Sequence, residues 1–189
     1  SLSAYSQEYW QQAVDYKMEV DIDVKTFKYS GKQELLYTNN SPDSLKKVFY
    51  HLYFNAFQPG SEMSDRIKTG KDKNKRFRID IDSLEPNEVG YLKVSNLKQD
   101  GNVLKHELSE TILEVSLSKP LIPGETTKLT LNFEGQIPKL VRRAGRNSSE
   151  GVALSMAQWY PKLAEYDYEG WNAEPYLGRE FHGGWGDFD

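Results

Sequence analysis

The sequence predicts a mainly β fold, and two observations carry that prediction. Several segments alternate apolar and polar residues with the period of two that characterises a sheet with one solvated face. Stretches rich in Gly, Pro, Asn, Asp and Ser separate these segments at the spacing typical of a sandwich or a meander. One helical pattern, at the start of the chain, is the exception.

The clearest strand is KMEVDIDVK, residues 17–25, in which Met18, Val20, Ile22 and Val24 alternate with charged residues. The other expected strands, about seven in all, are ELLYTNN (34–40), KVFYHLYF (47–54), YLKVSNL (91–97), TILEVSL (111–117), KLTLNFE (128–134) and GVALSM (151–156). Turns are expected at YSGK (29–32), NNSPDS (39–44), QPGS (58–61), EPNEVG (85–90), KQDGN (98–102) and LIPGE (121–125).

The predicted helix is short and lies at the N-terminus. Tyr5, Tyr9 and Ala13 fall four residues apart, which places them on one helical face. Trp10 and Val14 extend the same face.

Length and charge exclude several classes of protein. With 189 residues and 38% hydrophobic content, residues 1–189 are expected to form a single domain. A formal charge of −4 gives no bias toward nucleic acid or an anionic membrane. No run of about 18 apolar residues predicts a membrane span, and the absence of Cys excludes disulfides and thiolate metal sites.

Two basic stretches interrupt the strand pattern. Residues 64–80 are rich in Lys and Arg but offer one aromatic ring, so a solvated loop is favoured over a nucleic-acid patch. Residues 140–151 read as a long surface loop. The alternative is that its arginines bind a carboxylate or phosphate bidentately; they are Arg142, Arg143 and Arg146.

Motifs for catalysis and for metal binding are missing. His51, His106 and His182 are too scattered for a helical zinc pair, and HELSE (106–110) ends in Glu where a second His is needed. There is no nucleophile elbow, phosphate-binding loop or dinucleotide fingerprint. The sequence therefore predicts no catalytic residue and no metal ligand in this chain.

A set of motifs points to a known family. YHLYFNAFQPGSEM (50–63) is followed by EGQIP (134–138), by QWYPK (158–162) with YD and GW behind it, and by GDFD (186–189). This order resembles the N-terminal domain of the zinc aminopeptidases that include aminopeptidase N and leukotriene hydrolase, and bacterial members most of all. The resemblance covers nearly the whole chain.

The resemblance implies a saddle-like, largely antiparallel β domain that packs on a separate catalytic domain and helps to wall its peptide-binding cleft. Zinc would lie in that catalytic domain, whose HExxH motif is absent here, so this chain alone is expected to be inactive. The implied partners are the catalytic domain of the same parent protein and a peptide substrate. Bacterial relatives of this type are commonly exported, which implies a periplasmic or cell-surface location.

The resemblance also suggests substrate contacts. AQWYP (157–161) is similar to a TQFEP-like segment that holds the substrate's amino group; it keeps Gln158 and has Tyr160 where the family has an acid. A competing alignment places the amine anchor near Glu150. The candidate substrate-binding residues are therefore Gln158, Tyr160 and Glu150.

The aromatic residues of residues 156–185 suit an interdomain contact or a cleft wall, because each ring offers an apolar face and a polar tip. The candidates are Trp159, Tyr166, Trp171 and Trp185. Packing within the domain is the alternative for any single ring. A different class of function also fits the composition: a stand-alone carbohydrate-binding or protein-interaction β-sandwich whose rings stack on sugar faces.

Overall fold

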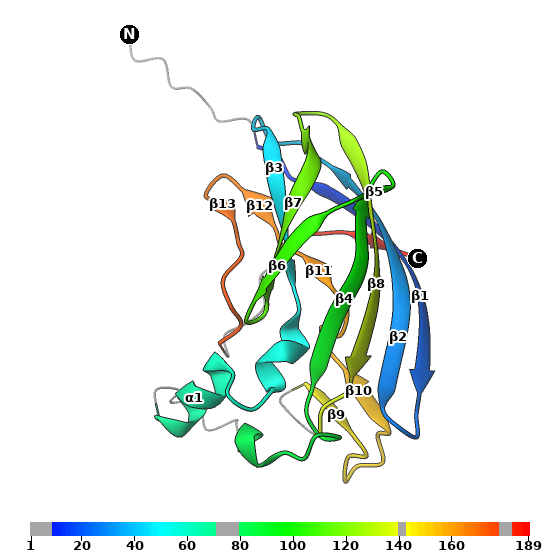
Figure 1. The fold of residues 1–189 in the computed structure, drawn as a ribbon, viewed down its shortest axis with the longest axis vertical. Coiled ribbons are helices and arrows are strands. Elements are labelled where there is room, and N and C mark those ends of the chain that lie inside the picture. The colour runs from blue at the N-terminus through cyan, green and yellow to red at the C-terminus, as the bar shows by residue number, and fades with distance from the viewer. Residues whose placement is uncertain (1–8, 71–79, 140–142, 178–182) are drawn as a thin grey trace.

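The fold is that of a computed structural model, which describes residues 9–70, 80–139, 143–177 and 183–189 (Figure 1). Two antiparallel sheets enclose one hydrophobic core, to which both contribute buried side chains. The mainly β, antiparallel fold predicted from the sequence is confirmed.

The larger sheet has the strand order β14-β1-β2-β8-β4-β5. Its strands are β1 (Ala13–Asp23), β2 (Lys28–Thr38), β4 (Tyr91–Gln99), β5 (Asn102–Val103), β8 (Thr126–Gln136) and β14 (Asp187–Phe188). All neighbours are antiparallel except β14, which pairs parallel to β1 at the edge. Along β2 the buried Gln33, Leu35 and Tyr37 alternate with more exposed residues, so this strand turns one face to the core.

The smaller sheet has the order β11-β3-β7-β6. Its strands are β3 (Leu45–His51), β6 (Lys105–Ser109), β7 (Ile112–Leu121) and β11 (Lys162–Leu163). Two short hairpins accompany the sheets, β9 (Ala144–Arg146) with β10 (Leu154–Met156), and β12 (Tyr166–Asp167) with β13 (Gly170–Trp171). The helical elements are η1 (Tyr53–Phe57), α1 (Glu62–Lys68) and η2 (Ile81–Ser83).

The one described α-helix, α1, begins at Glu62, directly after the turn expected at residues 58–61, and its residues 64–68 were expected to belong to a solvated loop. Ser61 caps it, because its side chain accepts a hydrogen bond from Ser64 N at 3.2 Å. Residues 52–54, expected to continue a strand, instead leave β3 and enter η1.

The predicted N-terminal helix is wrong where the structure can test it. Ala13 and Val14 belong to β1 and pair with Thr38 and Tyr37 of β2. Tyr5 lies outside the described residues. Every residue of β1 has a partner residue on β2. This pairing stabilises the strand more than the helical spacing of a few side chains could stabilise a short helix.

The turn predicted at residues 29–32 is also wrong, because these residues lie within β2. Gly31 marks a close approach rather than a turn. A Cβ at this position would lie 2.5 Å from Phe133 Cζ and 2.6 Å from Glu19 O.

Candidate functional site

The segment with the QWYPK motif, residues 157–163, is fastened to the inner face of the larger sheet. Three hydrogen bonds hold it, from Tyr29 Oη to Trp159 O (2.6 Å), from Gln33 Nε2 to Pro161 O (2.9 Å) and from Leu163 N to Tyr16 Oη (3.0 Å). The donors and acceptors on the sheet side are all buried side chains of β1 and β2. Water cannot reach these side chains, so breaking one of the three hydrogen bonds would leave a buried polar group without a partner.

Gln158 has an unusual backbone and an unusual side chain within this segment. Its φ is 58°, in the left-handed region that side chains other than glycine rarely adopt. Its Oε1 is buried and has no hydrogen-bond partner in the part of the chain that the structure describes. Strain and an unsatisfied buried acceptor are both costly, and both occur preferentially where a ligand binds.

Tyr160 lies at the edge of the same segment and is half-buried. Its ring packs edge-on against Tyr16 at 5.7 Å and against Phe188 at 5.8 Å. Burial raises the pKa of Tyr160 to about 12, so its hydroxyl stays protonated at neutral pH. The site offers here a hydrogen-bond donor where the family motif has an acid.

A small pocket opens beside Tyr160, between β1, β11 and the C-terminal segment. Its cavity volume is about 170 Å³, and its aromatic lining residues are Tyr16, Tyr37, Tyr160, Trp185 and Phe188. This aromatic wall suits an apolar or ring-bearing group.

Two polar groups belong to residues that line this pocket. The Tyr37 side chain is only 1% exposed, so its hydroxyl is buried, and this hydroxyl has no hydrogen-bond partner among the described residues. Burial lowers the pKa of the Lys162 ammonium, and Glu165 opposes that shift. Lys162 also lies directly over Gly183, where a Cβ would meet its ammonium group.

The rim of the pocket exposes two large rings. Trp185 is 82% exposed and Phe188 is 56% exposed. Phe188 stacks on Tyr16 with centroids 4.7 Å apart and an interplanar angle of 3°. Exposed rings next to a concave surface are a common feature of protein interfaces.

The other three rings predicted to form a cleft or interdomain contact pack within this domain. Trp159 lies edge-on to Tyr29 at 5.7 Å, and Trp171 lies 5.5 Å from Phe49. Tyr166 lies 5.1 Å from Trp171 and donates a hydrogen bond to Asp43 Oδ2 at 2.9 Å. Each of these rings is only half-buried, so an edge remains accessible.

Glu150 is exposed in the turn between β9 and β10, and it belongs to neither the pocket nor the fastened segment. Sequence analysis missed Tyr37 and Lys162. Period-two alternation could have placed Tyr37 on the inner face of β2, but nothing in the sequence brings Lys162 next to it.

The basic stretches are described only in part. Lys68 forms an ion pair with Asp82, whereas residues 71–79 lie outside the described residues. Arg142 and His182 also lie outside the described residues, whereas Arg146 belongs to β9.

The described residues contain no group of three or more His, Cys, Asp or Glu side chains that could hold a metal ion. These residues therefore do not fit a zinc ion. In the same part of the chain, no helix has the length and apolar character needed to cross a membrane.

No protein-family model matches this sequence, and no curated protein matches it. Solved structures similar to the chain include the M1 zinc metallopeptidase of Deinococcus radiodurans, with 18% identity and a TM-score of 0.47. The match covers 78% of this chain and 26% of that chain. A mutant of that enzyme bound to a Tyr-Ser-Ala substrate matches at 19% identity, with the same TM-score and coverage. A two-domain M1 zinc metallopeptidase mutant bound to L-arginine matches at 18% identity and a TM-score of 0.47, and the chain spans 27% of its length.

Proposed function

We propose that this chain is a non-catalytic N-terminal β domain of a zinc-dependent aminopeptidase-like protein, where it packs on the catalytic domain and forms one wall of the peptide-binding cleft. The motif order from residue 50 to residue 189 supports the family. The observation that carries the cleft role is the strained backbone and unpaired side-chain oxygen of Gln158.

Gln158 has the chemistry to receive the amino end of a peptide. Its Oε1 is buried in the free chain, so the half-buried amide has to turn outward to meet a ligand. A protonated α-amino group would then supply the partner that Oε1 lacks, and a hydrogen bond to a charged donor is stronger than one between neutral groups. The hydrogen bonds at Trp159 O and Pro161 O hold the backbone on both sides of Tyr160, which limits how far Gln158 can relax. The backbone next to Gln158 is thus positioned before the substrate arrives.

The pocket rim supplies the proposed contact with the catalytic domain. Trp185 and Phe188 present apolar ring surface to solvent, and covering it would contribute favourable free energy at about 25 cal/mol per Å² buried. Metal chemistry and bond cleavage belong, in this proposal, to the catalytic domain. The residues described here bind and orient.

The test uses the natural protein that contains this sequence. Gln158→Ala is compared with wild type and with Gln58→Ala, a control that removes a half-buried amide hydrogen-bonded to Asn55 at 3.0 Å. We expect Gln158→Ala to raise KM for aminoacyl p-nitroanilides about tenfold, since one charge-assisted hydrogen bond is lost. Gln58→Ala should leave KM unchanged. An unchanged KM in Gln158→Ala would remove Gln158 from the site.

One observation favours a second function. The exposed indole of Trp185 beside Phe188 is the kind of flat platform on which sugar rings stack in carbohydrate-binding modules. Affinity electrophoresis of the chain on a panel of polysaccharides separates the two proposals. Retardation that Trp185→Ala abolishes would favour the carbohydrate-binding module, whereas migration unchanged by any polysaccharide supports the peptidase domain.

A further inference from the structure

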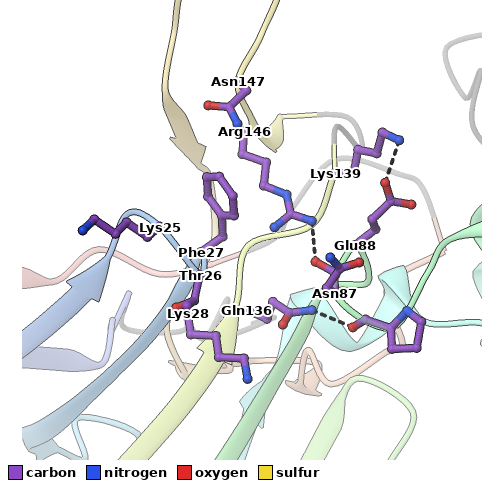
Figure 2. Close-up of a pocket in the computed structure, with 11 residues that line it drawn as sticks. Lys25, Thr26, Phe27, Lys28, Asn87, Glu88, Gln136, Lys139, Arg146 and Asn147 are labelled. Atoms are coloured by element: carbon purple, nitrogen blue, oxygen red, sulfur yellow. Dashed lines mark hydrogen bonds and ion pairs between the residues drawn. The ribbon is translucent and has the colours of Figure 1, made fainter.

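A second concave surface lies at the opposite end of β1 from the aromatic pocket. The turn between β1 and β2, the segment Pro86–Glu88, the end of β8 and Arg146 of β9 enclose a groove of about 760 Å³ (Figure 2). Tyr16 and Asp23, the last residue of β1, are seven positions apart along the strand, which corresponds to about 23 Å at roughly 3.3 Å per residue.

Cationic side chains dominate this groove, although the whole chain has a formal charge of −4. Its ionisable lining residues are Lys25, Lys28, Lys139, Arg146 and Glu88. Glu88 is neutralised locally, because Lys139 Nζ lies 2.7 Å from its Oε1. Among the described residues, no carboxylate lies within ion-pair distance of the other three cations.

Arg146 is the fixed donor of the groove. Its guanidinium carbon lies 4.3 Å from the centroid of the Phe27 ring, and its Nη2 donates a hydrogen bond to Asn87 O. Figure 2 shows the guanidinium held between these two residues. Burial lowers the pKa of Arg146 from its ordinary 12.5, which leaves the group charged at neutral pH. A planar, oriented guanidinium is the side chain best suited to binding a carboxylate with two hydrogen bonds.

The turn between β1 and β2 supplies the aromatic ring on which Arg146 packs. Phe27 has a φ of 59°, an uncommon conformation for a large side chain. Asp23 stabilises the turn: its carbonyl oxygen accepts from Phe27 N at 2.8 Å, and its carboxylate accepts from Lys25 N at 2.8 Å and from Thr26 Oγ1 at 2.7 Å. The turn thus holds Phe27 in the position that Arg146 requires.

Most backbone N–H groups around the groove are already used. Their acceptors are Asp23 for Lys25, Thr26 and Phe27, Glu85 O for Glu88, Glu88 O for Lys139, and Ala153 O for Asn147. Phosphate sites typically rely on a nest of free backbone N–H groups or a helix N-terminus. Here side-chain cations are the main available donors, and the groove is open rather than closed around one ion, which favours carboxylates on a peptide chain.

We propose that this groove binds an acidic peptide segment, with one carboxylate on Arg146 and neighbouring carboxylates reached by Lys25 and Lys28. Figure 2 shows Lys25 and Lys28 both pointing away from Arg146, and their flexible stems allow the ammonium groups to turn toward a ligand. The inference goes beyond the proposed function, because it concerns a groove that Gln158 does not line.

The test is a titration of the 189-residue chain with a capped oligoglutamate peptide at low ionic strength, followed by amide chemical shifts and by calorimetry. A capped oligoglutamine of equal length and inorganic phosphate are titrated in parallel. We expect oligoglutamate to shift the amides of Lys25 to Lys28 and of Asn87, and oligoglutamine and phosphate to leave them unchanged. Phosphate that displaces oligoglutamate at equal concentration would overturn the peptide assignment.

Three variants complete the test. Arg146→Gln should lower the affinity for oligoglutamate about tenfold, since a charge-assisted pair is lost. Arg146→Lys keeps the charge and the fold while losing the planar fork, and should weaken binding in the same direction. The matched control, Lys119→Gln, removes an exposed cation paired with Glu125 outside the groove and should change the affinity less than about twofold. Equal affinity in Arg146→Gln, Arg146→Lys and wild type would overturn the inference.

Discussion

The hydroxyl groups of Tyr29 and Tyr37 make a matched pair for testing what fastens the QWYPK segment. Both tyrosines lie in β2 and are almost fully buried, 3% and 1% exposed. Tyr29 Oη donates a 2.6 Å hydrogen bond to Trp159 O, whereas Tyr37 Oη has no partner among the described residues. The substitutions Tyr29→Phe and Tyr37→Phe remove the same atom and keep the ring.

The expected stability changes differ in size and can differ in sign. Tyr29→Phe loses one hydrogen bond and leaves the partly buried Trp159 O without its donor, which costs about 2 kcal/mol. For a chain of this size the loss lowers Tm by about 4–8 °C. Tyr37→Phe removes a hydroxyl that was desolvated without compensation, so the free energy of unfolding should stay within about 0.5 kcal/mol of wild type or rise.

Urea unfolding followed by tryptophan fluorescence and circular dichroism measures both variants against wild type. The m values should agree, so that midpoints report stability alone. Equal losses of unfolding free energy in the two variants would refute the reasoning. They would show that removing a hydroxyl costs the same whether or not it donates a hydrogen bond to Trp159 O.

Three further predictions follow from the same contacts. Gln158→Gly should raise the free energy of unfolding by up to about 1 kcal/mol over Gln158→Ala, because glycine adopts a φ of 58° without strain; a less stable glycine variant in urea would contradict this. Gly31→Ala should cost about 2 kcal/mol or more, since its Cβ would lie 2.5 Å from Phe133 Cζ, and an unchanged urea midpoint would show that Phe133 moves freely. Burial lowers the pKa of Lys162 below its ordinary 10.5, so the folded chain binds that proton less tightly than the unfolded chain, and the contribution of Lys162 to stability should rise with pH between the folded pKa and 10.5. Burial raises the pKa of Tyr29 and Tyr50, which lowers stability as pH approaches 10 in wild type and variant alike, so the difference in urea midpoint between wild type and Lys162→Met should grow in favour of wild type across the interval, and parallel profiles would remove Lys162 as the cause.

Several strands were predictable from sequence because one face of the sheet is buried. Met18 and Val20 alternate with charged residues, and this pattern located the middle of β1. The start of β1 was not predictable, because Ala13 becomes a strand residue by pairing with Thr38 on another strand. In the sequence, a glycine such as Gly31 fits a turn as well as a close approach between neighbouring groups. Only the position of Phe133 in the fold shows that Gly31 marks a close approach.

The candidate site was predictable in its residue types and not in its geometry. The motif identified Gln158, but glutamine carries no signal for a left-handed backbone, and an unpaired oxygen is a property of its surroundings. Arg146 was noted as a possible carboxylate ligand. Its partner Asn87 is 59 positions away in sequence, so the groove appears only after folding.

The central claim is that the rim of the aromatic pocket is covered by a catalytic domain. Hydroxyl-radical footprinting read by mass spectrometry tests it directly, by comparing the 189-residue chain with the natural gene product that contains it. Trp185 and Phe188, 82% and 56% exposed here, should be oxidised several-fold more slowly in the natural product, while the exposed Tyr9 serves as the internal reference. Equal oxidation of Trp185 and Phe188 in both samples would contradict the account.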